Sequence, residues 1–132
     1  MIADTGPIIA WLNSEDQHHS WASKLPQSRP WLTLESCLAE AAWNLGQPTK
    51  VAQVVELGLV MVVPLDAEDW QRIAELAARF SDHDIDLVDF AVVRLSEKHR
   101  SEKVATVDRE HFSILRRFRS ERLPLLLPSN PV

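Results

Sequence analysis

The segment from Asp86 to Phe112 constrains the fold more than any other part of the chain, and it reads DLVDFAVVRLSEKHRSEKVATVDREHF. Between Leu87 and Val93 every residue is apolar except Asp89, which predicts a helix that is buried on most sides and carries one carboxylate. A polar turn and a short β-branched run at Val104 to Val107 follow, and Asp108 ends that run. Because functional groups of open parallel sheets collect at the carboxyl ends of strands, this pattern predicts a site there.

The rest of the chain alternates short apolar runs with helical patterns. Besides the central helix, we expect strands at 1–3, 31–33, 59–65, 104–107 and 123–127, and helices at 7–13, 14–25, 34–45, 50–57, 66–80 and 110–116. The run at 59–65 is nearly all apolar, as expected of a strand covered on both faces. The alternation predicts an α/β fold, a three-layer α/β/α sandwich with a mainly parallel sheet of about five strands, in a single domain over residues 1–132.

The composition is that of a folded protein without membrane segments. Hydrophobic residues make up 45% of the chain and charged residues 25%. No apolar run approaches the roughly 20 residues that cross a bilayer, and no signal peptide is recognisable, so we expect a cytoplasmic protein with no membrane partner. The net charge of −5 argues against nucleic-acid binding by charge alone, but metal ions can reverse the field of an acidic site. The single cysteine, Cys37, is expected to be a buried thiol.

The positions of several carboxylates suggest a shared site. Asp4 and Asp108 each end a predicted strand, whereas Asp89 and one of two glutamates, Glu35 or Glu40, lie at or beside apolar helix faces. Taken singly, each aspartate is also explained as a turn or cap residue at a helix start. In a doubly wound sheet these positions converge on one cleft, where carboxylates repel one another unless a divalent cation holds them. Oxygen ligands favour Mg²⁺ or Mn²⁺ over zinc.

Four stretches of the chain resemble one protein family. They read IADTGPIIAWLN, LESCLAEAAWNL, LDAEDWQRIAELAARFSDHDIDLVDFAVV and VATVDREHF, in that order along the chain. Together they resemble the PIN-domain ribonucleases, and most closely the VapC-type toxins of type II toxin–antitoxin systems. The resemblance covers nearly the whole chain and implies a PIN-like α/β/α fold.

The resemblance also implies the residues of the site. The implied catalytic residues are Asp4, Glu40, Asp89 and Asp108. Glu40 is selected over Glu35 because it precedes the Ala-Ala-Trp stretch, as the family's glutamate does. Asp4 and Asp89 would hold Mg²⁺ or Mn²⁺ most directly, with the other two acting through water or a second ion. Thr5 and Thr106 match supporting hydroxyl residues. Asp86 stands where the family often has serine or another small residue, and we expect it to cap its helix.

The activity implied by the resemblance is metal-dependent hydrolysis of phosphodiester bonds in RNA by an endoribonuclease that serves as the toxin of a toxin–antitoxin pair. Two alternatives stay open: a non-catalytic PIN-like module that binds RNA or protein, and a magnesium-dependent phosphohydrolase of another α/β family.

The resemblance also implies partners, namely the RNA substrate, a cognate antitoxin and a second copy in a homodimer. The antitoxin would lie along the first helices, where the chain offers Trp11, Leu12 and Trp21. Trp43 lies opposite the apolar stripe of its helix and is expected on a partner surface. The basic residues that either receive RNA phosphates or form a solvated face are Lys98, Arg100, Lys103, Arg109, Arg116 and Arg117.

Overall fold

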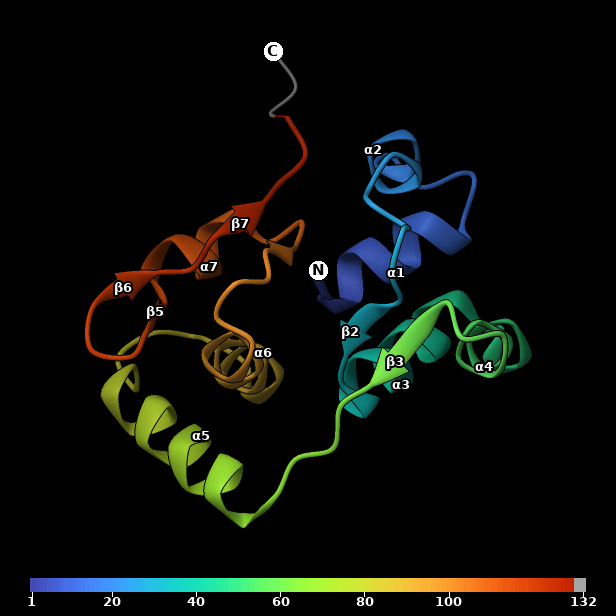
Figure 1. Ribbon diagram of the computed structural model, residues 1–132. Helices are drawn as coiled ribbons and strands as arrows, with labels where there is room; N and C mark the ends of the chain where they lie inside the picture. Colours follow the sequence, from blue (N-terminus) through green and yellow to red (C-terminus); the bar gives the residue numbers. More distant parts are fainter. Residues whose placement is uncertain (130–132) are drawn as a thin grey trace.

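The structure is a computed structural model that describes residues 1–129, and strands alternate with helices along it (Figure 1). The strands are β1 (Ile2–Ala3), β2 (Trp31–Thr33), β3 (Val60–Val62), β4 (Val104–Ala105), β5 (Arg116–Arg117), β6 (Glu121–Arg122) and β7 (Leu125–Leu126). The helices are α1 (Thr5–Leu12), α2 (His19–Ser23), α3 (Glu35–Leu45), α4 (Pro48–Glu56), α5 (Ala67–Arg79), α6 (Leu87–Lys98) and α7 (Arg109–Ile114). Within the described residues, no helix combines the length and the apolar composition that a membrane span requires. Residues 130–132 of the predicted 1–132 domain lie outside the described part of the chain.

Five strands form one parallel sheet in the order β3-β2-β1-β4-β7. The first strand lies in the middle, with Ile2 opposite Leu32 on one side and opposite Val104 on the other. Ile2, Ala3, Val104 and Ala105 are fully buried, so the centre of the sheet is apolar on both faces. The predicted α/β fold with a mainly parallel sheet of about five strands is confirmed.

The path of the chain through the sheet reverses direction once. It moves from β1 outward to β2 and β3, and then crosses back to β4 and β7 on the other side of β1. Right-handed crossovers therefore place α1 to α4 on one face of the sheet and α5 to α7 on the other. Helix contacts agree, because α1 packs against α2 and α3, α3 against α4, and α5 against α6. Figure 1 shows the two groups in opposite halves of the view. The strand order switches between β1 and β4, where open α/β sheets bind ligands at the carboxyl ends of their strands.

The central helix α6 and its neighbour α5 begin where the sequence predicts. The Asp86 carboxylate accepts a hydrogen bond from the Val88 amide at 3.2 Å, so Asp86 is the N-cap of α6. At the start of α5, Asp66 and Asp69 each accept a hydrogen bond from the other's backbone amide, both at 2.9 Å. These caps determine where the two helices begin, and therefore the position of the buried Asp89 in the first turn of α6.

The helix predicted over 14–25 is wrong in its first half, because α2 is confined to the second half of that range. The Asn13 side chain accepts a hydrogen bond from the Glu15 amide at 3.0 Å, and the Asp16 side chain accepts one from the His18 amide at 2.8 Å. Short polar side chains that bond to nearby amides stabilise turns instead of a helix. The segment between α1 and α2 is therefore a pair of turns.

The prediction of a strand covered on both faces at 59–65 is also wrong. Strand β3 has three residues, pairs with β2 on one side, and lies at the edge of the sheet. Met61, in its centre, is 53% exposed. A strand with an apolar sequence is covered only when other strands and helices flank it. The apolar run cannot show whether they do, because the order of strands depends on the whole chain.

The antiparallel hairpin of β5 and β6 is an element that the sequence did not predict. The buried guanidinium of Arg117 holds it against the end of α6 by donating hydrogen bonds to the Ser96 carbonyl and hydroxyl and to the Arg100 carbonyl. The same guanidinium forms an ion pair with Glu121 across the hairpin at 3.2 Å. Arg117 is thus a structural residue, bound within the protein.

Candidate active site

The four predicted carboxylates converge where the strand order switches. Asp4 follows β1, Asp108 follows β4, Asp89 stands in the first turn of α6, and Glu40 comes from α3. The carboxylates are close enough to affect one another's pKa. The charges of Glu40 and Asp108 raise the pKa of Asp4, and the charges of Asp4 and Asp108 raise the pKa of Asp89. The hydroxyl of Thr5 donates a hydrogen bond to Glu40 Oε1 at 2.7 Å. The structure therefore gathers side chains from two strand ends and two helices into one acidic cluster.

Thr106 joins the two strand ends in this cluster. Its hydroxyl donates a hydrogen bond to Asp4 Oδ2 at 2.8 Å and accepts one from the Asp108 amide at 3.1 Å. Thr106 is fully buried, and so is most of Asp4. Burial raises the pKa of Asp4, and the charges of Glu40 and Asp108 add to the rise, which the hydrogen bond from Thr106 only partly offsets. Asp4 is thus a buried carboxylate that repels its neighbours.

The Val107 side chain packs closely against Gly6 in the first turn of α1. A Cβ atom on Gly6 would lie 2.4 Å from Val107 Cγ2, a distance that real side chains do not tolerate. Val107 directly precedes Asp108, so the absence of a side chain at position 6 leaves room for Val107 beside the segment that carries Asp4.

His111 is a member of the cluster that the sequence analysis missed. Its Nδ1 lies 3.1 Å from Asp89 Oδ2 and 3.0 Å from Asp108 Oδ2, and its backbone amide donates to Asp108 Oδ1 at 2.9 Å. A signal was available, because His111 is three residues after Asp108 at a helix start, and residues three apart share a helix face. Partial burial lowers the pKa of His111, but the neighbouring carboxylates of Asp108 and Asp89 outweigh it and raise the pKa.

The electrostatic environment of Asp89 raises its pKa. Burial raises its pKa to about 6, the charges of Asp4 and Asp108 contribute to the rise, and the contact with His111 opposes it. Among the described residues, none of the four acids forms an ion pair with a lysine or arginine. Negative charge therefore exceeds positive charge in the cluster.

The donor atoms of this cluster suit a divalent cation. One donor atom each from Asp89, Asp108 and His111 lie within 4.8 Å of one another. Carboxylate oxygens are the ligands that Mg²⁺ and Mn²⁺ prefer, and a cation would offset the repulsion that raises the pKa values of Asp4 and Asp89.

Cys37 lies beneath the cluster and takes no part in it. The residue is fully buried, and burial together with the charge of Asp4 raises the pKa of its thiol to about 12. The prediction of a buried thiol is confirmed.

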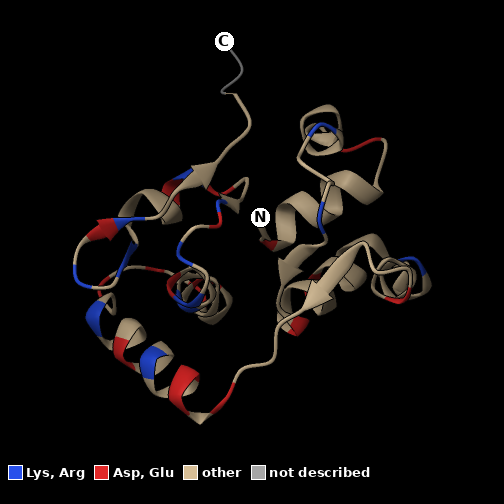
Figure 2. Ribbon diagram, in the orientation of Figure 1, with Lys and Arg blue, Asp and Glu red and all other residues tan. Residues whose placement is uncertain are grey.

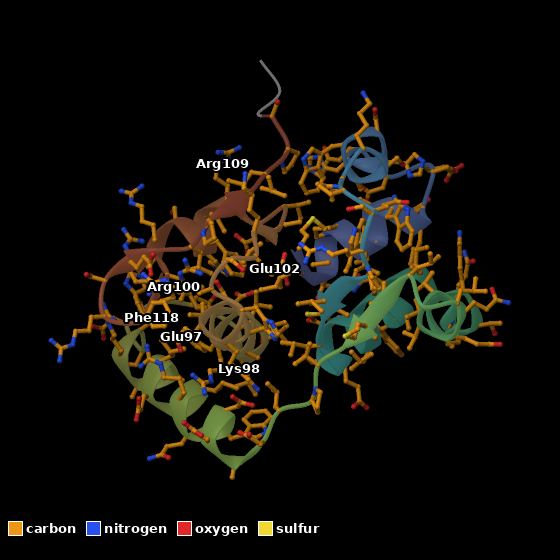
Figure 3. All side chains as sticks on the ribbon, viewed as in Figure 1. Glu97, Lys98, Arg100, Glu102, Arg109 and Phe118 are labelled. Carbon is orange, nitrogen blue, oxygen red and sulfur yellow. The ribbon has the colours of Figure 1, made fainter. Side chains whose placement is uncertain are left out.

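The structure does not bring most of the predicted RNA-binding residues to the cluster. Arg109 lies next to Asp108, whereas Lys98 is nine residues after Asp89 on α6, about 13 Å away along the helix axis. Figure 3 shows Lys98 and Arg100 together near Glu97 and Phe118, with Arg109 well apart from them. Lys98 also pairs with Asp69 at 2.9 Å. Figure 2 shows basic positions mainly in the half of the molecule that holds α5, α6 and the β5–β6 hairpin.

The other three residues predicted to contact RNA differ in their exposure and in the hydrogen bonds that they make within the protein. Lys103 is exposed just before β4, at the amino ends of the strands, whereas the cluster lies at their carboxyl ends. Arg116 donates hydrogen bonds to carbonyls at the end of α7, and Arg117 is buried under the hairpin.

Comparison with known proteins identifies the family of this chain. The family model described as PIN domain matches residues 1–117. Ribonuclease VapC26 of Mycobacterium tuberculosis is 25% identical over 124 residues, which cover 88% of this chain and 92% of that protein. VapC20 of Mycobacterium tuberculosis, described as a Sarcin-Ricin loop cleaving toxin, has a crystal structure with a similar fold. The TM-score is 0.66, the identity is 19%, and the match covers 78% of this chain and 85% of that one. The family match spans most of the chain and includes all four acids, and the chain therefore belongs to the PIN domain family.

Proposed function

We propose that this protein is a metal-dependent endoribonuclease of the VapC type, the toxin of a toxin–antitoxin pair. The observation that carries the proposal is the convergence of Asp4, Glu40, Asp89 and Asp108 at the switch point of the sheet, with no lysine or arginine paired to them among the described residues. Membership of the PIN domain family and the similarity to a protein named a ribonuclease support it.

The four acids divide into two groups in this proposal. As the resemblance to PIN domains implies, Asp4 and Asp89 would hold Mg²⁺ or Mn²⁺ most directly, and they are also the two most buried carboxylates of the cluster. Glu40 and Asp108 complete the site through water or a second ion. When bound, the cation supplies a Lewis acid that activates water and neutralises charge on the phosphate.

The protein's other contribution is to position these groups. The buried hydroxyl of Thr106 orients the Asp4 carboxylate, and the hydroxyl of Thr5 orients Glu40. Because the supporting groups lie at strand ends and helix starts, the acids are held in place before RNA binds, which is what electrostatic catalysis requires.

The direct test is cleavage of a mixed RNA pool by the purified protein with Mn²⁺, Mg²⁺ or EDTA. We expect cleavage with either ion, complete loss in EDTA, and recovery when excess metal is restored, because the acids repel one another without a cation. Gel or sequencing analysis of the RNA ends gives the readout. Cleavage that persists in EDTA would identify a contaminating ribonuclease and count against the proposal.

Arg109 is the basic residue that we propose to contact RNA near the scissile phosphate. It is exposed directly after Asp108, and its guanidinium donates a hydrogen bond to the Pro128 carbonyl at 2.9 Å. It lines a hollow of about 260 Å³ with Gln17 and His18. Lys98, Arg100, Lys103 and Arg116 are proposed as contacts to outlying parts of the RNA. Arg117 is excluded, since its guanidinium is used inside the protein.

The partner of a toxin of this kind is an antitoxin protein, and we propose that one binds along the first helices. Trp11, Leu12 and Trp21 are each partly exposed there. Trp11 also packs against Trp31 with ring centroids 4.6 Å apart, so part of its surface belongs to the core. Trp43, at 87% exposure on α3, offers a further apolar contact.

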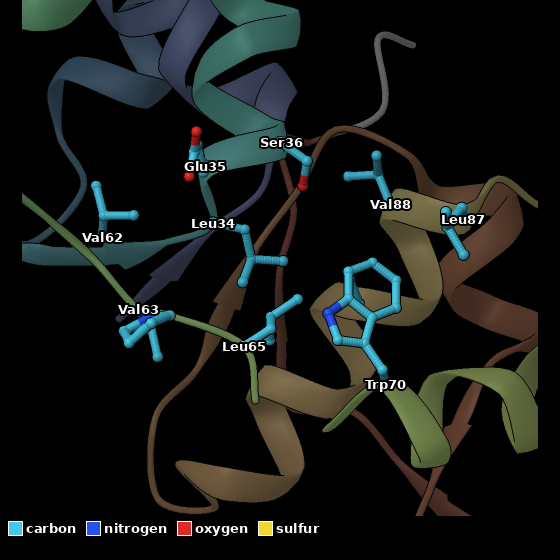
Figure 4. A pocket seen from close by; sticks show the side chains of 11 residues that line it. Leu34, Glu35, Ser36, Val62, Val63, Leu65, Trp70, Leu87 and Val88 are labelled. Atoms are coloured by element: carbon cyan, nitrogen blue, oxygen red, sulfur yellow. The ribbon is translucent and has the colours of Figure 1, made fainter. Parts of the chain in front are cut away.

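We further propose that the protein forms a homodimer through an apolar groove beside the acidic cluster (Figure 4). The groove has a volume of about 560 Å³ and lies between the start of α3, the segment after β3, and the starts of α5 and α6. Trp70 and Leu87 line it and are 48% and 53% exposed. Val88 lines it as well and precedes Asp89, so a second copy seated here would bring two acidic clusters together.

Leu87→Glu tests the dimer. A charge buried at the two-fold contact meets its own copy, so we expect the dissociation constant of the dimer to rise about a hundredfold or more, as for the loss of a central interface residue. Sedimentation over a range of protein concentrations measures it. The matched control is Leu57→Glu, which adds the same charge at an exposed leucine outside the groove. A wild-type protein that stays monomeric, or a Leu87→Glu protein as dimeric as the control, would refute the interface.

A further inference from the structure

The His111 ring lies between two carboxylates of the acidic cluster. Its Nδ1 atom is shared between two carboxylates, at 3.1 Å from Asp89 Oδ2 and 3.0 Å from Asp108 Oδ2. One ring nitrogen carries at most one proton toward these two oxygens. The His111 side chain is 31% exposed, so solvent and ions reach it.

These distances fit the coordination shell of a cation. Ligands about 2.1 Å from an octahedral ion are about 3.0 Å apart when they occupy neighbouring corners. The Nδ1 atom has that spacing from each of the two carboxylate oxygens, and donor atoms of all three residues lie within 4.8 Å of one another. The three side chains therefore present their donor atoms at distances that the ligands of a single cation can have.

His111 is also held rigidly enough to act as a ligand. It lies in the first turn of α7, and its amide donates to Asp108 Oδ1 at 2.9 Å, while Asp108 caps the same helix. The preceding backbone is tied to the sheet, because the Thr106 amide donates to the Leu126 carbonyl at 3.1 Å. A side chain on such a support keeps its nitrogen near the carboxylate oxygens with little loss of conformational entropy on binding.

We infer that His111 is a nitrogen ligand of a divalent cation held between Asp89 and Asp108, the second ion that the proposed site allows, and that it makes this position prefer a transition-metal ion such as Mn²⁺ over Mg²⁺. The inference rests on the proposed function, since it places the cation at the same acidic cluster. Mg²⁺ is a hard ion that binds oxygen almost exclusively, whereas imidazole nitrogen suits first-row transition metals. A site made of carboxylates alone lacks this source of discrimination.

The test uses Mn²⁺ as a spectroscopic probe bound to the intact protein. Electron spin-echo modulation detects a ¹⁴N nucleus bonded to Mn²⁺, and we expect this signal in the wild-type protein and its loss in His111→Asn. His83→Asn is the matched control, because His83 is exposed and outside the cluster. Calorimetric titration should show the dissociation constant for Mn²⁺ rising about tenfold or more in His111→Asn and that for Mg²⁺ changing less than about threefold.

Each contrary outcome has a distinct meaning. Bound Mn²⁺ without a ¹⁴N signal in the wild-type protein, or an equal loss of Mn²⁺ and Mg²⁺ affinity in His111→Asn, would overturn the inference and leave His111 as a residue that positions Asp89 and Asp108. The wild-type spectrum decides this even if the variant does not fold. A wild-type protein that binds neither ion would overturn both the inference and the proposed metal-dependent function.

Discussion

Asp89→Asn is expected to lose RNA cleavage and at the same time to make the metal-free protein more stable. An asparagine side chain cannot supply the negative charge that the cation needs, so the rate of cleavage should fall roughly 10² to 10³-fold, the loss seen when one preorganised electrostatic group is removed. Asparagine keeps the shape of the side chain and can still accept a hydrogen bond from His111. The loss of RNA cleavage in Asp89→Asn therefore measures the contribution of the Asp89 charge.

The gain in stability follows from the raised pKa of Asp89. Burial and the charges of Asp4 and Asp108 raise it to about 6, above the value of about 3.9 in an unfolded chain. The folded protein thus binds the proton more tightly than the unfolded chain does. Ionisation of Asp89 costs stability at neutral pH, and this cost disappears as pH falls below about 4. Two pKa units set an upper limit of about 3 kcal/mol, and we expect a gain of about 1 to 2 kcal/mol in the free energy of unfolding at pH 7.

Thermal unfolding in EDTA at pH 7 and near pH 4 measures this prediction beside the cleavage assay. The advantage of Asp89→Asn should be present at pH 7 and nearly absent at the lower pH. Asp82→Asn is the control, because it removes the same charge from an exposed residue in the connection before α6. A variant that is less stable than wild type at pH 7, or one that cleaves RNA at the wild-type rate, would contradict the account of the cluster.

Among the variants proposed for this protein, Asp69→Asn is expected to lower the free energy of unfolding the most. The Asp69 side chain is 1% exposed and receives hydrogen bonds from the Asp66 amide, from Arg94 Nε at 2.8 Å and from Lys98 Nζ at 2.9 Å. This carboxylate therefore joins α5 to α6. Without its charge, two partly buried cations are left without their partner, which costs about 3 kcal/mol or more in the free energy of unfolding. The midpoint of thermal unfolding should fall by about 10 °C.

The effect should also depend on pH in a defined direction. Burial by itself raises the pKa of Asp69, but the hydrogen bonds from the Asp66 amide, Lys98 and Arg94 outweigh it and hold the pKa well below its usual range. Such a group stabilises the fold above its unfolded pKa of about 3.9, and this stabilisation is lost as pH falls through the lower folded value. Wild type should lose stability below about pH 4, and Asp69→Asn should lose less there.

Urea denaturation at several pH values gives the readout. Glu68→Gln is the control, because this neighbouring acid in the first turn of α5 is exposed and should change stability by less than about 0.5 kcal/mol. If Asp69→Asn unfolds like the control at pH 7, the buried ion pairs do not stabilise the contact between α5 and α6.

Local patterns in the sequence predicted several elements because their causes are local. Asp86 and Asp66 are the expected caps, since a carboxylate two or three residues before a free amide binds it in any tertiary context. The buried helix with Asp89 and the buried thiol of Cys37 follow from apolar periodicity. The helix expected over 14–25 was wrong for a local reason too, because Asn13 and Asp16 bind amides of the following turns.

By itself, the sequence determined the α/β class, the main helices and the identity of the four acids, the last through resemblance to PIN domains. Only the tertiary structure decided which residues meet. The order β3-β2-β1-β4-β7 left Met61 at an exposed edge, brought Asp4 beside Asp108, and placed Lys98 far from the cluster. It also made His111 a neighbour of Asp89, 22 residues away in the chain. Strand order results from long-range pairing and crossover handedness, which leave no periodic trace in a segment of sequence.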